Sequence, residues 1–130
     1  EKAAALLRPL MQQGQDAGQE TVWVIMLDTK MRAIGAPVEV SRGTLDECMM
    51  PTRDIMRAAL MANASAVILA HNHPSGDPRP SAEDVNVTKK IMAAGDIIGV
   101  RVLDHIIIGT KTKINPGYVS IRETGLVSFK

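Results

Sequence analysis

Two histidines and one aspartate stand in an order that suits the binding of a metal ion. His71 and His73 are separated by one residue, and Asp84 follows a short loop. On an extended chain, residues two apart leave the same face with Cα atoms about 7 Å apart, so both imidazoles can reach one ion at about 2.0 Å. Two imidazoles and one carboxylate leave a fourth zinc position for water. This pattern predicts a catalytic zinc site rather than a structural one.

The segment that joins the histidines to Asp84 favours this geometry. It holds three prolines, which stiffen it, and Gly76, which permits a turn. Ser81 is a helix-start signal and places Asp84 in the first helical turn, facing back to the histidines. Two alternatives remain open. A His-x-His pair also occurs among ordinary surface or core histidines, and Ser81-x-x-Asp84 can form a capping box, which we expect to compete with metal binding by Asp84.

Helices and strands alternate around this segment, which predicts an α/β class with a mixed sheet and helices on its faces. Helical periodicity and start signals predict helices over Lys2–Gln12, Pro51–Met61 and Ser81–Met92. β-branched and alternating runs predict strands over Thr21–Leu27, Pro37–Ser41, Ser65–Ala70, Val100–Ile108 and Tyr118–Ile121. The short Asp28–Arg32 link predicts an antiparallel hairpin between the first two strands, and the apolar Ser65–Ala70 run predicts a central strand.

Composition restricts the function classes. The 130 residues carry a formal net charge of +1 and only one Trp, one Tyr and one Phe, which gives no support for nucleic-acid binding. The single cysteine, Cys48, rules out an internal disulfide and favours a reducing, cytoplasmic location. The longest apolar runs are too short to span a bilayer, so we expect no membrane association. The oligomeric state is left open.

The same residues resemble the JAMM (MPN-plus) metalloprotease family, whose motif is His-x-His-Pro, six residues, then Ser-x-x-Asp. The matching positions are His71, His73, Pro74, Ser81 and Asp84. The His71–Pro78 and Leu103–Gly109 segments look more closely like the RadC branch of that family. The resemblance extends from about residue 20 to about residue 125 and therefore covers most of the chain.

This resemblance implies one JAB/MPN domain of cytidine-deaminase-like architecture over residues 1–130, with Zn²⁺ bound by the residues named above. It also implies a glutamate upstream that acts as general base on the water, for which Glu20, Glu39 and Glu47 are candidates. Glu20 is favoured because it lies just before the predicted strand Thr21–Leu27, where RadC-like sequences usually carry a glutamate. The implied function is hydrolysis of a peptide or isopeptide bond in a peptide or protein substrate, with Ser81 stabilising the oxyanion.

Several alternatives accompany this hypothesis. The chain could be a DNA-associated or protein-interaction module that retains a metal, or a zinc hydrolase of another kind. Nucleobase deaminases are disfavoured because their His-x-Glu and Pro-Cys-x-x-Cys motifs are missing from the sequence. The N-terminal helical region common in RadC-like proteins is also missing, which weakens a DNA-related role. His105 could be a ligand or support the site, but we expect a buried histidine hydrogen-bonded to backbone.

Overall fold

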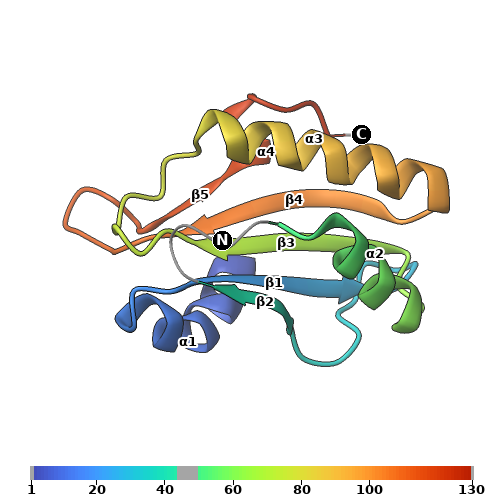
Figure 1. The fold of residues 1–130 in the computed structure, drawn as a ribbon, viewed down its shortest axis with the longest axis horizontal. Helices are drawn as coiled ribbons and strands as arrows, with labels where there is room; N and C mark the ends of the chain where they lie inside the picture. The colour runs from blue at the N-terminus through green and yellow to red at the C-terminus, as the bar shows by residue number, and fades with distance from the viewer. Residues whose placement is uncertain (1, 44–49, 130) are drawn as a thin grey trace.

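The computed structural model describes residues 2–43 and 50–129 and confirms a mixed sheet flanked by helices (Figure 1). Its helices are α1 (Lys2–Asp16), α2 (Thr52–Met61), α3 (Ala82–Ile98) and α4 (Ile121–Thr124). Its strands are β1 (Glu20–Leu27), β2 (Val38–Gly43), β3 (Ala66–Asn72), β4 (Arg101–Ile108) and β5 (Tyr118–Ser120). The strand order is β2-β1-β3-β4-β5, in which only the β3–β4 pair is parallel. None of the described helices is long and apolar enough to cross a membrane.

Alternation along the central strands buries both faces of the sheet. On β1, Val22, Val24 and Met26 pack with α2 and α3, whereas Ile25 and Leu27 pack with α1. Figure 1 shows the corresponding layers, with α1 behind the sheet and α2 and α3 in front of it. Because successive strand residues point to opposite faces, neighbouring residues near the end of β3 also face different helices. This alternation separates the surroundings of His71 from those of Asn72.

Three elements differ in extent from the sequence prediction. Helix α1 continues through Gly14, where a Cβ would lie 2.8 Å from Thr21 Cγ2, so the glycine allows the helix to approach β1 closely rather than ending it. Helix α3 runs beyond Met92 and ends at Gly99, which adopts φ 84°. The last strand ends at Ser120, whose side chain accepts from Glu123 N and starts α4, a helix absent from the prediction.

The hairpin between β1 and β2 is confirmed, with Glu20 opposite Gly43. Its connection is longer than predicted because Ala33 still bridges to Leu27, and β2 begins only at Val38. The Asp28 carboxylate accepts hydrogen bonds from the backbone of the turn that follows β1. The antiparallel pairing of β1 with β3 places the N-terminal end of β1 beside the C-terminal end of β3.

A bulge in β4 decides which face His105 occupies. Val102 pairs with Val67, but the next residue of β3, Ile68, pairs with Asp104, so Leu103 is the extra residue. Without the bulge, alternation from Val102 would direct His105 toward α1. The bulge reverses the alternation and turns His105 toward α3, where His71 also lies.

Candidate metal centre

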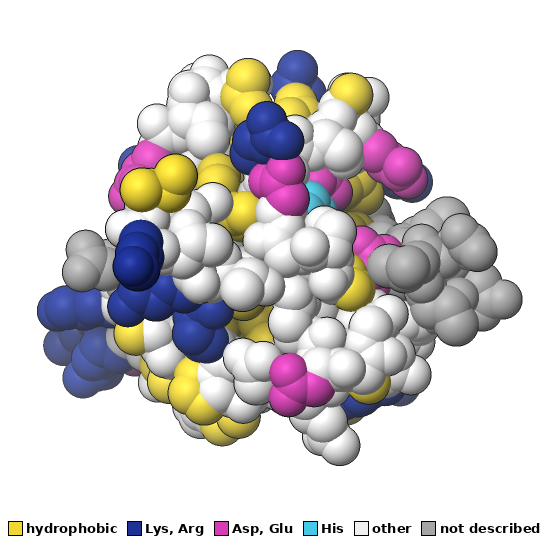
Figure 2. Space-filling model, turned by 90° about the vertical axis from the view of Figure 1, so that its left-hand side faces the viewer, with side chains coloured by type: hydrophobic (Ala, Val, Ile, Leu, Met, Phe, Trp, Pro, Cys, Tyr) yellow, Lys and Arg dark blue, Asp and Glu magenta, His cyan; other side chains and the backbone are white. Residues whose placement is uncertain are grey.

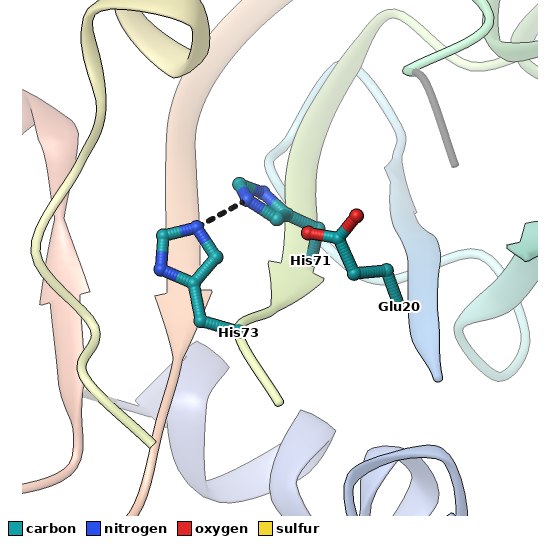
Figure 3. Close-up of side chains that lie close together, drawn as sticks. All are labelled: Glu20, His71 and His73. Atoms are coloured by element: carbon teal, nitrogen blue, oxygen red, sulfur yellow. Dashed lines mark hydrogen bonds between the residues drawn. The ribbon is translucent and has the colours of Figure 1, made fainter. Parts of the chain in front are cut away.

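The candidate site lies where the end of β3, the start of β1 and the start of α3 meet. Val22 pairs with His71, which brings the first residue of β1, Glu20, close to the end of β3. His73 follows that strand directly, and its backbone N–H donates to Ile108 O. Figure 3 shows the side chains of Glu20, His71 and His73 directed toward a common space from these two strands. The predicted convergence of the two histidines is therefore confirmed.

Three side chains present their ligand atoms at the spacing of a metal coordination sphere. The Nε2 atoms of His71 and His73 are 3.0 Å apart (Figure 3). The Oδ1 atom of Asp84 lies 3.2 Å from His71 Nε2, and its Oδ2 lies 3.2 Å from His73 Nε2. Ligands placed tetrahedrally at about 2.0 Å from a zinc ion are separated by about 3.3 Å. The donor set and its spacing thus fit a zinc ion.

The hydrogen bond on the far side of His73 supports this interpretation. Its Nδ1 lies 2.9 Å from the backbone oxygen of Asp77, and because a carbonyl only accepts, Nδ1 carries the proton. Neutral His73 then directs a lone pair from Nε2 toward the Asp84 carboxylate, which is also an acceptor. Acceptors that face one another need a cation between them. In the protein without metal, a proton takes that place. Burial alone would lower the pKa of His73, but hydrogen bonds to Asp84 and the Asp77 carbonyl together raise it.

Glu20 stands slightly apart from these three side chains. Its carboxylate, His71 and His73 form a group whose ligand atoms all lie within 4.8 Å of one another. Within the described chain, however, Glu20 forms no ion pair or hydrogen bond with either histidine. Asp84 is therefore the closer of the two carboxylates to both imidazoles, and Glu20 stands beside the group that they form. Burial raises the pKa of Glu20, although the nearby His71 and His73 partly oppose that shift.

Asp84 also caps its helix, as the Ser81-x-x-Asp84 pattern allowed. The Ser81 hydroxyl accepts from Asp84 N at 3.0 Å, and Asp84 Oδ2 accepts from Ser81 N at 2.9 Å, so the capping box is complete. We expected tight capping to compete with metal binding by Asp84. The cap is present, but the carboxylate has two oxygens with several lone pairs, so its use in the cap leaves lone pairs for an ion. Burial would raise the pKa of Asp84, but the adjacent imidazoles of His71 and His73, together with the hydrogen bond from Ser81 N, hold it far below the usual range.

The other predicted site residues lie in different surroundings. Ser81 is exposed at the N-terminus of α3, next to the ligand group, and its hydroxyl proton is not used by the cap. Glu39 lies on β2 opposite Trp23 and forms an ion pair with Arg42 at 2.8 Å. Glu47 falls outside the described residues, as does Cys48. Of the two described candidates for the base, only Glu20 belongs to the metal-binding group.

Asn72 is a structural part of the site that sequence reasoning missed. It is fully buried and points to the α1 face, opposite to the histidines on either side of it. Its side-chain oxygen accepts from the backbone N–H and the hydroxyl of Thr21, while its NH₂ donates to Gln19 O and Gln15 Oε1. Gln19 and Thr21 flank Glu20 in sequence. Asn72 therefore fixes the backbone on both sides of Glu20.

His105 differs from the expectation that backbone groups would satisfy its ring. Its Nε2 lies 2.7 Å from His71 Nδ1, and its Nδ1 lies 2.6 Å from Thr88 Oγ1, so both partners are side chains. The residue is completely buried, and burial lowers its pKa well below the ordinary value. The expectation of backbone partners was therefore wrong, and His105 supports the site from behind His71. Thr88, four residues after Asp84, lies within the predicted helix Ser81–Met92, but its contact with His105 was not predicted.

The surface around the site is more acidic than basic. Figure 2 shows a histidine side chain reaching the surface between Asp and Glu side chains, while most of the Lys and Arg side chains in this view gather some distance away. Asp77 contributes to the rim of the site, and its carboxylate forms an ion pair with the exposed Arg79. His71 and Asp84 are only 6% and 13% exposed, so the ligand atoms lie at the bottom of this surface rather than on it.

With this fold and this group of side chains, the chain is an α/β domain of the JAB/MPN type. More narrowly, it belongs to the family described as the RadC-like JAB domain, whose model matches residues 1–126. This confirms the family resemblance found in the sequence and the fold expected from it.

Curated relatives carry the family name UPF0758. One from Clostridium beijerinckii is 41% identical over 118 residues, which cover 91% of this chain and 49% of the relative. Another, from Thermotoga maritima, is 47% identical over 107 residues, or 82% of this chain and 46% of the relative. The chain thus spans about half the length of the curated relatives it matches.

Proposed function

We propose that this chain is a zinc-dependent hydrolase that cleaves an amide bond in a peptide or protein substrate. The observation that carries the proposal is the placement of three acceptors, on His71, His73 and Asp84, at metal-ligand spacing with the Glu20 carboxylate standing beside them. A purely structural zinc site closes its fourth position with another protein ligand. Here the neighbouring carboxylate stays beyond hydrogen-bond distance of the histidines, as a base acting through water requires.

A bound zinc ion would polarise the substrate carbonyl and make a coordinated water more acidic. Glu20 would accept a proton from the attacking water and pass it to the leaving nitrogen. The raised pKa of Glu20 suits both halves of that transfer, since a carboxylate with a higher pKa holds a proton more readily. Ser81, whose hydroxyl proton is not used by the helix cap, would donate to the oxygen on which negative charge develops.

Amide cleavage is favoured over the other hydrolytic reactions by the composition of the site. Nucleases that use two metals are usually rich in carboxylates, whereas this site offers two imidazoles with one ligating carboxylate. Peptide and isopeptide bonds share the same reacting amide, so the residues at the metal do not distinguish them. The proposed substrate is therefore a peptide or protein, and the proposal extends to this chain rather than to the longer relatives.

The test compares Glu20→Gln with Glu39→Gln in a screen of peptide and isopeptide substrates. Gln preserves size and hydrogen bonding but does not take up the proton, so Glu20→Gln should lower the rate by about 10² to 10⁴. Zinc content, measured by elemental analysis, should stay at the wild-type value because the ligands are untouched. Glu39→Gln removes a charge on β2 away from the ligands and should leave the rate near wild type.

Two outcomes would contradict the proposal. If the wild type holds no zinc after purification with added metal, the ligand assignment is wrong. If the wild type holds zinc and hydrolyses a substrate, but Glu20→Gln is fully active, the base lies elsewhere. A chain that holds zinc yet cleaves no amide in the screen would favour the alternative, a DNA-associated or protein-interaction module that retains a metal.

A further inference from the structure

A chain of side-chain hydrogen bonds runs from the backbone of α3 to the rear of His71. It starts at the carbonyl oxygen of Asp84, which accepts from the Thr88 hydroxyl at 2.7 Å. A carbonyl only accepts, so the one hydroxyl proton of Thr88 is committed to this bond. The Thr88 oxygen lies 2.6 Å from His105 Nδ1 and has only lone pairs left to offer. His105 Nδ1 must therefore carry a proton and donate it to Thr88.

The second half of this series of hydrogen bonds determines which ring nitrogen of His71 carries a proton. His105 has no exposed surface, and an imidazolium buried without a carboxylate in contact is strongly disfavoured, so the ring is neutral. A neutral ring with its proton on Nδ1 has a bare Nε2. That atom lies 2.7 Å from His71 Nδ1, so His71 must donate from Nδ1. Neutral His71 then keeps its lone pair on Nε2, the atom that faces Asp84 Oδ1.

We propose that Thr88 and His105 are positioning residues that hold His71 in the tautomer with a free Nε2, ready to bind a metal. The inference rests on the proposed metal site and adds how that site keeps one ligand prepared. Free histidine exchanges between its two tautomers, and a ligand histidine is usually fixed by the bond that its other nitrogen makes. Here the Thr88 hydroxyl donates to a backbone carbonyl, and this bond determines which atom is the donor in each of the following hydrogen bonds, to His105 and to His71.

The fold provides this arrangement through two local features. Asp84 and Thr88 lie one turn apart on α3, so the residue that offers the carboxylate ligand also offers the carbonyl that starts the chain. The bulge at Leu103 turns His105 toward the same space from β4. The start of α3 thereby provides both the proposed carboxylate ligand and the carbonyl oxygen from which the tautomer of His71 is controlled.

Replacement of Thr88 by Val and by Ser separates this role from packing. Thr88→Val keeps the buried shape and removes the hydroxyl, so His105 is free to reverse its tautomer and place a proton on His71 Nε2. We expect zinc affinity, measured by competition with a chelator of known affinity, to fall by about 10- to 100-fold. Thr88→Ser loses a buried methyl group but keeps the hydroxyl, and its affinity should stay within a few-fold of wild type. A packing role predicts the reverse order.

A second measurement needs neither zinc nor substrate. In ¹⁵N-labelled, metal-free protein at pH 8, the nitrogen shifts of His71 should show a protonated Nδ1 in wild type and Thr88→Ser, and a mixed or reversed tautomer in Thr88→Val. Circular dichroism and thermal unfolding confirm that each variant is folded. Thr88→Val with wild-type shifts and affinity would overturn the inference, as would Thr88→Ser behaving like Thr88→Val. Loss of amide hydrolysis by itself would bear on the proposed function and leave the tautomer result standing.

Discussion

The buried Asn72 side chain offers the sharpest test of how the strands hold the site together. Asn72→Leu keeps the number and branching of the side-chain heavy atoms but removes all four hydrogen bonds that the amide makes. Gln15 is partly exposed and can turn to water, and the Thr21 hydroxyl can rotate to other partners. The Thr21 N–H and the Gln19 carbonyl are fixed in the backbone and lose their partner. The substitution therefore leaves the buried Thr21 N–H and the partly buried Gln19 carbonyl without these partners.

Each unsatisfied buried group costs about 1–3 kcal/mol, so the free energy of unfolding should fall by roughly 2–6 kcal/mol. Urea unfolding with EDTA measures this loss without a contribution from bound metal. Asn86→Leu makes the same replacement on an exposed position of α3 and should stay within about 0.5 kcal/mol of wild type. A loss below about 1 kcal/mol in Asn72→Leu, similar to the control, would mean that water or a local shift satisfies these groups, and would refute the reasoning.

Two further predictions concern metal binding. Asp84→Asn should weaken zinc binding strongly, because the Asp84 carboxylate faces both histidines. Asp77→Asn should not, because Asp77 contacts His73 only through its backbone oxygen. The reverse order of zinc affinities in a chelator competition would show that the ligand assignment is wrong. Zinc affinity should also fall as the pH decreases. The pKa of His73 is raised, so a proton competes with zinc for the Nε2 atom already at a pH above the usual histidine range. Once that nitrogen is protonated, the zinc affinity should fall roughly tenfold for each further decrease of one pH unit. Equal affinities at pH 8 and pH 6 would contradict this.

The grouping of His71, His73 and Asp84 was predictable because their placement depends on short-range geometry. His71 and His73 project from one face of the same extended segment, and Asp84 follows from a helix start that Ser81 marks. The mixed sheet followed similarly from alternating helices and strands. Each of these inferences needs only the conformation of a few consecutive residues, which side-chain type and spacing largely determine.

The supporting residues depend instead on how distant segments meet. Asn72 bonds to residues more than fifty positions earlier in the chain, and that pairing requires the register of β1 against β3. His105 reaches His71 only because Leu103 forms a bulge. No local sequence pattern in β4 indicates that bulge. One signal was available for Thr88, which lies four residues after Asp84 and therefore on the same side of the helix.

The two functions of Asp84 connect the metal centre to the start of α3. Its Oδ2 accepts from Ser81 N while its Oδ1 faces His71, and its own backbone carbonyl begins the chain that ends on the same histidine. The N-terminus of a helix carries partial positive charge, which stabilises the carboxylate in its ionised, ligating form. A displacement of this helix start would therefore disturb the carboxylate, its cap and the tautomer of His71 together. For this reason the capping box, which we first weighed against metal binding, is compatible with the proposed ligation by Asp84 and would align its carboxylate.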